Sequence, residues 1–328
     1  MADRATRPLM NIARLKNFTE VVRNGFNISA TAERLYTSQP TLSKQMKMLE
    51  DELGLALFTR RGKNLVGLTP AGERVMELAK GVVAQVEQIS QLSLGEQLAT
   101  SGVLRIATTH TQARYTLPSV ITAFHHRYPE VAIHIHQGAP AQLAQMVQSG
   151  DVEMAIATES MYLFDELAAI PCHRWGRSVV VPHGHPLLEC QPLSMADLAR
   201  YPLITYVFGF TGRFKMDKAF GRHGLSPKTV LTATDTDVIK HYVRLGMGVG
   251  VIASVAFDEG DRESLVCLNI DHLIASSATH VCLRRHQHLR DYIYDFIHLY
   301  APHISRETVQ QHLINQAPVA NMVELPWL

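Results

Sequence analysis

The sequence predicts a chain of three parts: a helical head, one long linking helix, and an α/β body of two lobes. Apolar residues recur every three or four positions up to about Leu94, which indicates helices. After Gly102, short β-rich runs alternate with amphipathic segments, which indicates α/β lobes with mainly parallel sheet. The length of 328 residues, of which 46% are apolar, suits two or three separate cores.

These patterns also place the domain boundaries. We expect a flexible extension at residues 1–9, the head at 10–69 and the linking helix at 70–96. A hinge at 97–102 then leads to the body at 103–304 and a C-terminal tail at 305–328. Within the body, the first lobe is expected at about 103–170 and 276–304, and the second lobe at about 171–275. The hinge is placed where the helical pattern stops and a Ser-Gly pair follows.

Charge is unevenly distributed along the chain. Residues 1–70 contain 11 Lys and Arg against 6 Asp and Glu, whereas the remainder contains 20 against 24. A basic head favours a polyanionic partner. No apolar run reaches the roughly 18 residues that cross a bilayer, and no apolar leader begins the chain, so we expect a soluble cytoplasmic protein without a membrane partner. The four cysteines are far apart and form no CxxC pair, which argues against a disulfide framework or a zinc site.

A helix-turn-helix pattern lies between Asn27 and Gly54. A short helix over SATAERLY is followed by a break at Tyr36 and Thr37. Ser38 can cap a second helix, which tolerates Pro40 in its first turn. One face of this second helix is apolar and is expected to be buried: Leu42, Met46, Leu49 and Leu53.

The opposite face of the second helix suits double-stranded DNA. A helix that enters the major groove needs short polar groups for base edges and cations for phosphates. The residues that meet this need are Ser38, Gln39, Pro40, Thr41, Ser43, Lys44 and Lys47. The next stretch, LFTRRGKNLVGLTPAG, predicts a two-stranded wing with Arg60 and Lys63 near its tip, where cations suit the phosphate backbone. The alternative is a solvated helical hairpin with a charged loop.

The linking helix, from Pro70 to about Leu94, is expected to pair with a second copy of itself. Its apolar seam consists of Val75, Leu78, Val82, Val86, Ile89 and Leu92. A long helix with one apolar seam and no globular core around it needs a partner helix. We assign dimerisation to Val75, Leu78, Val82 and Ile89. The alternative is that the seam packs on its own domain.

The body carries few signs of an enzyme. It has no GxxxxGK[ST], GxSxG or HExxH motif, and GMGVG at 246–250 has the wrong spacing for a dinucleotide loop. The pairs His134/His136, His183/His185 and His286/His288 are typical of polar edges and loops rather than of metal sites. We therefore expect neither a catalytic residue nor a metal or cofactor. An enzyme of small sulfur metabolites with a fused DNA-binding head is kept only as an alternative.

Neutral hydrogen-bond donors collect where the strand VLRIA is followed by TTHTQARY. A helix is expected to begin near Gln112 or Ala113. The end of the strand and the start of this helix therefore carry Thr109, Thr111 and Gln112. Ligands bind at such strand ends in α/β sheets, and helix N-termini favour anions. Other strand ends provide Thr158 and Thr211, with Thr234 and Asp235 as weaker candidates. The pattern predicts a reversible anion site made from neutral donors, although each threonine could also be a simple helix cap.

The head motifs S-Q-P-T-L-S-K, L-E-D-E-L-G and L-T-P-A-G resemble those of LysR-type transcriptional regulators. The resemblance covers roughly residues 10–304. It implies a winged helix-turn-helix, a linker helix that forms homodimers and commonly tetramers, and a two-lobed effector domain that resembles periplasmic binding proteins. RNA polymerase is a further candidate partner.

The body motifs TTHTQARY, IATE, FGFTGR and LRDYIYDFIHLYAPH resemble the CysB branch of that family. This resemblance implies control of sulfur assimilation and cysteine biosynthesis genes by a small effector: N-acetylserine, O-acetylserine, sulfate or thiosulfate. Carried over by motif, the effector residues are Thr109, Thr111, Gln112, Thr158 and Thr211. The alternative within the family is a paralogue that controls the use of sulfonates or other sulfur sources.

Overall fold

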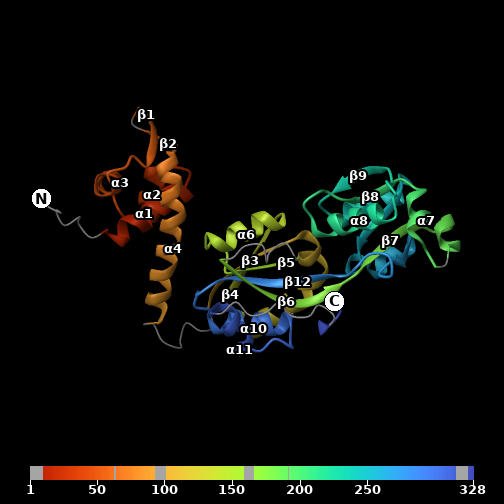
Figure 1. Cartoon of the computed structure of the whole chain (residues 1–328). Coiled ribbons are helices and arrows are strands. Elements are labelled where there is room, and N and C mark those ends of the chain that lie inside the picture. The colour runs from red at the N-terminus through yellow and green to blue at the C-terminus, as the bar shows by residue number, and fades with distance from the viewer. Residues whose placement is uncertain (1–9, 63, 93–100, 159–165, 191, 315–323) are drawn as a thin grey trace, which may run out of the picture. The chain divides into compact units, whose positions relative to one another are not determined.

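The computed structural model describes residues 10–62, 64–92, 101–158, 166–190, 192–314 and 324–328. The chain divides into two units, residues 1–95 and 96–328. The first unit contains the head and the linking helix, and the second contains the two-lobed body (Figure 1).

The head is a helix-turn-helix followed by a two-stranded wing. Its elements are α1 (Ile12–Arg23), α2 (Ile28–Arg34), α3 (Gln39–Leu53), β1 (Phe58–Arg61) and β2 (Asn64–Leu68). The side chain of Ser38 accepts a hydrogen bond from the backbone of Thr41, and Pro40 lies in the first turn of α3, as predicted. Leu42, Met46 and Leu49 are buried in the head core, while Leu53 packs at its edge.

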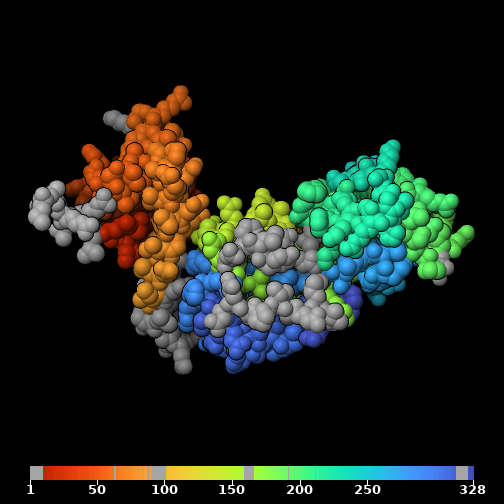
Figure 2. Space-filling model, in the orientation of Figure 1, coloured from red at the N-terminus to blue at the C-terminus, as the bar shows by residue number. Residues whose placement is uncertain are grey.

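The linking helix α4 (Pro70–Leu92) presents two different apolar faces. Met76, Ala79 and Val83 belong to the head core. Val75, which we assigned to the dimer seam, packs against that same core. By contrast, the side chains of Leu78, Val82 and Ile89 are 74%, 38% and 66% exposed. Figures 1 and 2 show the helix continuing past the head, so the part of the helix after Val83 extends beyond the head core.

The first lobe is a mixed five-stranded sheet in the order β4-β3-β5-β12-β6, counted over the described residues. Its strands are β3 (Gly102–Thr108), β4 (Val131–Gln137), β5 (Met154–Thr158), β6 (Leu167–Trp175) and β12 (Ser277–Arg284). One face is covered by α5 (Leu117–Arg127), α10 (Asp291–Tyr300) and α11 (Arg306–Ile314), and the other by α6 (Pro140–Gln148) (Figure 1).

The second lobe is also a five-stranded sheet, in the order β11-β7-β10-β8-β9 among the described strands. These strands are β7 (Arg177–Pro182), β8 (Leu203–Tyr206), β9 (Thr229–Ala233), β10 (Val249–Ala253) and β11 (Leu265–Asn269). The main helices are α7 (Met195–Ala199), α8 (Thr211–Arg222) and α9 (Thr236–Arg244), and short helical turns lie at Pro186–Glu189, Ser254–Ala256 and Glu259–Glu263.

Three expectations about the body need correction. The sheets are not mainly parallel, because β12 runs antiparallel to β5 and β6, and β7 runs antiparallel to β10 and β11. The chain leaves the first lobe after Trp175, later than the pattern suggested. The body also continues beyond Ile304: Val309 and Leu313 enter the first core, and Pro326 and Leu328 form backbone hydrogen bonds with Arg174 on β6.

Candidate functional site

The first strand of the body leads directly into an irregular helix. β3 ends at Thr108, whose hydroxyl donates to the carbonyl oxygen of Ile156 at 2.8 Å and so ties together two strand ends. The helix begins at His110, slightly before the predicted start, and residues Gln112–Thr116 have π-helical geometry. Turns of this kind often mark functional sites, because the extra residue re-aims side chains.

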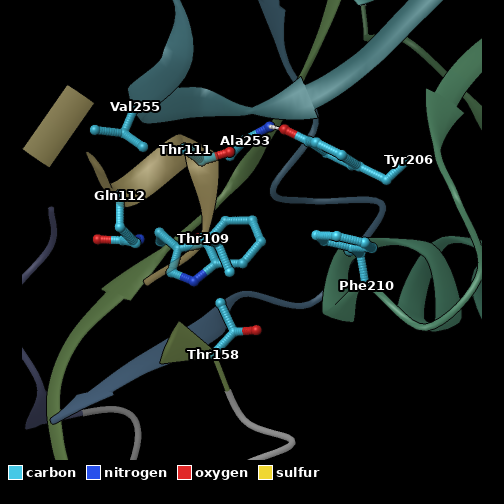
Figure 3. Close-up of a pocket in the computed structure, with 10 residues that line it drawn as sticks. Thr109, Thr111, Gln112, Thr158, Tyr206, Phe210, Ala253 and Val255 are labelled. Atoms are coloured by element: carbon cyan, nitrogen blue, oxygen red, sulfur yellow. Dashed lines mark hydrogen bonds between the residues drawn. The ribbon is translucent and has the colours of Figure 1, made fainter. Parts of the chain in front are cut away.

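The predicted effector residues meet at a cavity between the two lobes (Figure 3). Its empty volume is about 430 Å³, including the solvent at its mouth. The first lobe contributes Thr109, Thr111, Gln112 and Thr158, and the second lobe contributes Tyr206, Phe210, Gly212, Ala253 and Val255. Trp175 lines the cavity from the crossing between the lobes. The structure thus brings four predicted residues together with six that the sequence reasoning missed.

Gln112 presents its amide nitrogen to the cavity. Its side-chain oxygen already accepts hydrogen bonds from the hydroxyls of Thr116 at 2.6 Å and Tyr300 at 3.3 Å. Burial raises the pKa of Tyr300 well above its usual value, so this hydroxyl stays protonated as a donor. In Figure 3 the nitrogen of Gln112 lies on the side that faces Thr109. Gln112 is therefore fixed as a donor to whatever occupies the cavity.

Trp175 supplies another donor. Its side chain is only 6% exposed, and its indole N–H finds no hydrogen-bond partner among the described residues. An indole nitrogen can only donate, and leaving a buried donor unsatisfied costs roughly 1–3 kcal/mol. Trp175 also lines the cavity, so a ligand with acceptor atoms that reached this buried N–H would satisfy it.

A buried cation lies behind this wall, which the expectation of purely neutral chemistry missed. The guanidinium of Arg177 stacks on the ring of Trp175 at 4.7 Å and donates to the carbonyl oxygen of Ala275 and the hydroxyl of Ser277. Arg177 is 2% exposed, so water screens its charge poorly. The direct contacts available on the cavity wall are neutral, and the positive charge of Arg177 lies behind Trp175.

The remaining predicted residues are placed differently. Thr211 begins α8, between the cavity residues Phe210 and Gly212, but its side chain lies outside the described residues. Thr234 is exposed and does not belong to the cavity lining described above. Asp235 caps α9 by accepting from the backbone of Asp237. Its role in the second lobe is therefore that of a helix cap, one of the alternatives that the sequence left open.

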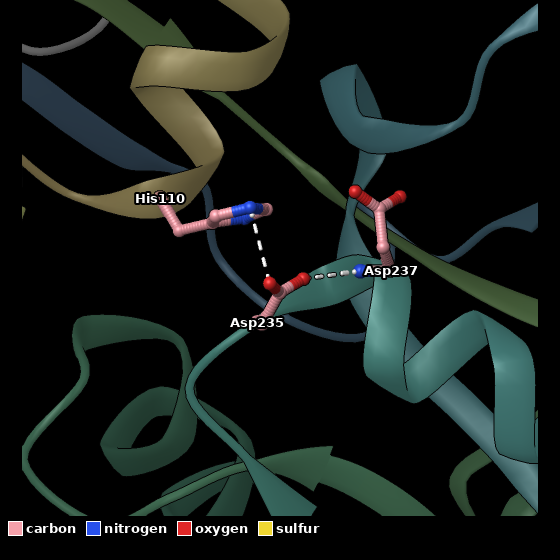
Figure 4. Close-up of side chains that lie close together, drawn as sticks. All are labelled: His110, Asp235 and Asp237. Atoms are coloured by element: carbon pink, nitrogen blue, oxygen red, sulfur yellow. Dashed lines mark hydrogen bonds and ion pairs between the residues drawn. The ribbon is translucent and has the colours of Figure 1, made fainter.

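Beside the cavity, the two lobes are joined by charged and polar contacts. His110 pairs with Asp235 at 3.1 Å, and the hydroxyl of Tyr115 donates to Asp237 (Figure 4 shows the His110 cluster). Burial, followed by the bond to Asp237, raises the pKa of Tyr115. Although burial acts to lower the pKa of Lys240, its bond to Asp261 and the neighbouring groups raise that pKa overall. Both groups therefore keep their protons at neutral pH.

His110, Asp235 and Asp237 are also the one cluster, among the described residues, in which three potential metal ligands approach one another. Asp237 is already engaged there by Lys240 at 3.1 Å and Arg114 at 3.8 Å. A metal ion bound to Asp237 would be repelled by these two cations or would have to displace them. The geometry fits an interlobe ion-pair network better than a metal centre.

The head presents a second candidate site. On α3, Gln39, Thr41, Lys44 and Lys47 are exposed and Ser43 is half-buried, and Gln39 donates to Ser43 at 3.1 Å. A polar hollow lies between α3 and the wing, with Gln39, Ser43, Arg60 and Asn64 on its walls; its empty volume is about 1050 Å³, including open solvent. Arg60 pairs with Glu50 at 2.7 Å, and Lys63 lies outside the described residues. This surface matches the shape and chemistry of a DNA-reading head.

An exposed reading helix with a wing, joined by a long helix to a two-lobed domain with a ligand-sized cleft, defines a ligand-responsive regulator of transcription. Comparison with known families agrees. A model described as "Bacterial regulatory helix-turn-helix protein, lysR family" matches residues 12–73, and one described as "LysR substrate binding domain" matches residues 98–304. The chain belongs to the LysR family of transcriptional regulators, which bind DNA, form oligomers and respond to small effectors; it is not an enzyme of the fused kind considered above.

Within that family, the chain is similar to CysB-like regulators. It is 45% identical to the HTH-type transcriptional regulator CysB of Haemophilus influenzae over 92% of this chain and 93% of that protein. It is 40% identical to the regulator cbl of Escherichia coli over 94% and 98%. Among solved structures, the cofactor-binding domain of the Cbl transcriptional regulator is 43% identical and covers 66% of this chain and 95% of its own, with a TM-score of 0.64.

Full-length relatives of known structure share the fold at lower identity. The CbnR structure in complex with its target DNA is 19% identical, covers 89% of this chain and 99% of its own, and has a TM-score of 0.62. This likeness extends the shared fold from the body to the head and linking helix. Among the described residues, no helix is both long and apolar enough to cross a membrane.

Proposed function

We propose that this regulator controls genes of sulfur assimilation and cysteine biosynthesis in response to a small anionic effector bound between the lobes. The observation that carries the proposal is the convergence of Thr109, Thr111 and Gln112 on one cavity. Trp175 lines the same cavity, and its buried indole N–H has no partner among the described residues. The effectors that fit this chemistry are sulfate, thiosulfate, N-acetylserine and O-acetylserine. No cofactor is needed for this function.

The neutral hydrogen-bond donors suit an anion that must dissociate again when its concentration falls. Each hydrogen bond to a charged group contributes roughly 1.5–3 kcal/mol, so a few neutral donors can hold sulfate without forming a direct ion pair. The free N–H groups at the start of the helix at His110 add to the donor set, because helix N-termini favour anions. Arg177, which stacks on Trp175 and is not among the residues that line the cavity, would strengthen the attraction through its charge.

DNA recognition is assigned to the head. Gln39, Thr41 and Ser43 would contact base edges, and Lys44 and Lys47 would contact phosphates, with Ser38 and Pro40 setting the start of the helix. The wing would place Arg60 and Lys63 on the backbone. The pairing of Arg60 with Glu50 means that this side chain must exchange one partner for another on binding, which makes Lys63 the better test of the wing.

The linking helix is assigned to self-association. Leu78, Val82 and Ile89 expose apolar surface that one chain leaves uncovered, and a second copy of the helix would bury it. Pairing of this kind gives a homodimer with two reading heads, and a homotetramer forms when two dimers combine. Val75 contributes to the head core instead of to the centre of this seam.

A second candidate function is supported by the apolar part of the cavity. Tyr206, Phe210 and Val255 face the donors from the second lobe. Such a wall would accept the hydrocarbon part of an organic sulfonate, so a paralogous regulator of alternative sulfur sources is the competing hypothesis. Inorganic sulfate would leave this wall without a partner.

A thermal-shift screen of the full chain decides between these functions. The panel consists of sulfate, thiosulfate, sulfide, O-acetylserine, N-acetylserine and a short alkyl sulfonate, each with a matched chloride control at equal ionic strength. Stabilisation by sulfate or the acetylserines, which grows with concentration as binding to the folded state requires, supports the first proposal. Stabilisation by the sulfonate alone supports the second, and no response to any of them contradicts both.

A further inference from the structure

A row of hydroxyl groups crosses from the second lobe into the cavity. The backbone N–H of Ala253 donates to the hydroxyl of Tyr206 at 3.2 Å, the first link, which Figure 3 shows as a dashed line. The hydroxyls of Tyr206 and Thr236 are 2.8 Å apart, and those of Thr236 and Thr111 are 3.3 Å apart. Thr236 is fully buried and Tyr206 is nearly so, which keeps water out of the row.

We infer the direction of the other links from the need of each buried hydroxyl proton for an acceptor. Each hydroxyl carries a single proton. The oxygen of Tyr206 accepts the N–H of Ala253, and among the described residues the one hydroxyl that its own proton reaches is that of Thr236. Because buried donors are almost always satisfied, Tyr206 donates to Thr236. By the same reasoning Thr236 donates to Thr111, and the proton of Thr111 is left to point into the cavity.

We propose that Tyr206 and Thr236 are positioning residues that orient and polarise the hydroxyl of Thr111 as an obligatory donor to the effector. This inference rests on the proposed function of the cavity. It selects for an anion that carries no proton of its own, of which sulfate is the simplest. At pH 8 hydrogen phosphate has the same charge as sulfate and nearly the same shape. Its P–OH group is a hydrogen-bond donor, however, and would face the donors of the cavity wall without an acceptor.

The row also links ligand binding to the arrangement of the lobes. Thr111 belongs to the first lobe, whereas Thr236, Tyr206 and Ala253 belong to the second. An anion that accepts from Thr111 ends the chain of donors, and successive hydrogen bonds in such a chain strengthen one another. The effector is therefore bound best when the lobes are close enough for Thr236 to reach Thr111.

Calorimetry on the full chain at pH 8, with sulfate and with hydrogen phosphate, tests the inference. We expect wild-type protein to bind sulfate at least tenfold more tightly than hydrogen phosphate. Thr236→Val and Tyr206→Phe should each weaken sulfate binding by about two- to tenfold and narrow its advantage over phosphate. Thr236→Ser keeps the hydroxyl and should bind as wild type does. Thr205→Val is the matched control, because it removes a buried hydroxyl that contacts Met216 instead of the row.

A double mutant separates orientation from packing. Once Thr111→Val has removed the last hydroxyl, adding Thr236→Val should cost no further sulfate affinity, whereas a packing defect would add its cost in full. Two results would overturn this inference and leave the proposed function standing: losses of sulfate affinity that add up in the double mutant, or unchanged sulfate binding in both Thr236→Val and Tyr206→Phe. If Thr236→Val fails to fold, Tyr206→Phe, which keeps the ring, makes the same comparison. A wild-type chain that binds neither sulfate nor acetylserine would overturn the proposed function and this inference together.

Discussion

Replacing Trp175 with Phe should weaken effector binding while changing the stability of the unliganded protein only a little. The indole N–H is buried without a partner among the described residues, so the cost of removing it from water is already present before ligand binds. A hydrogen bond from it to an anion would then contribute roughly 1.5–3 kcal/mol, or about ten- to a hundredfold in affinity. Phenylalanine keeps an aromatic ring over Arg177 and removes the unsatisfied donor, which offsets part of the lost packing.

The assay pairs calorimetric titration of sulfate with urea unfolding of the unliganded chain. Trp327→Phe is the control, because Trp327 stacks on Arg174 near the C-terminus and does not line the cavity. We expect weak binding only in Trp175→Phe, with unfolding free energies that differ little among the three proteins. Wild-type sulfate affinity in Trp175→Phe would refute the reasoning, since the vacant donor would then have no ligand to complete it.

Three further outcomes are expected. Val82→Asp would bury an unpaired charge in the helix seam at a cost of several kcal/mol, so sedimentation should show dissociation; an unchanged oligomer would mean that Val82 does not lie in the seam. Lys63→Ala should weaken DNA binding similarly for all sequences and reduce the salt dependence by about one unit, whereas relaxed preference at a single base position would contradict the wing assignment. Burial, with a smaller contribution from His303, lowers the pKa of His173 from 6.5 to about 4. The folded state therefore loses stability as the pH falls from 6.5 to 4, and His173→Leu should reduce the loss in unfolding free energy between pH 7 and 4.5 by about 2 kcal/mol; an equally steep loss would show that His173 is not responsible.

Much of the head followed from short-range chemistry. The cap at Ser38, the proline after it and the stripe from Leu42 are local features, so they could be read without knowing the rest of the fold. The strand ends of the body could also be predicted from the sequence, because each consists of a β-rich run followed by threonine. This is why Thr109, Thr111, Gln112 and Thr158, which line one cavity, could be grouped from the sequence alone.

What could not be predicted depends on contacts between distant segments. Val75 and Leu78 have the same apolar pattern, and only the head core distinguishes the buried one from the exposed one. Strand β6, which carries Trp175 to the cavity, spans the position near residue 170 where the sequence pattern placed the boundary between the lobes. Thr236 is separated from Thr111 by 125 positions, so no local pattern could reveal their contact. The one available clue was the Trp-Gly pair at 175–176, which lies where the chain crosses between lobes.

The central claim is that the cavity between the lobes is the effector site, and substitution of Thr109 tests it most directly. Thr109 lines the cavity and is 7% exposed, so Thr109→Glu would place a carboxylate against a bound anion, while Thr109→Gln adds similar bulk without the charge. The measurement is sulfate and acetylserine titration of the two full-length variants by calorimetry, with binding to DNA in the absence of effector as the check on folding. We expect Thr109→Glu to lose detectable effector binding, Thr109→Gln to retain more of it, and both to bind DNA as wild type does. Wild-type effector affinity in Thr109→Glu would contradict the claim and place the effector site elsewhere in the chain.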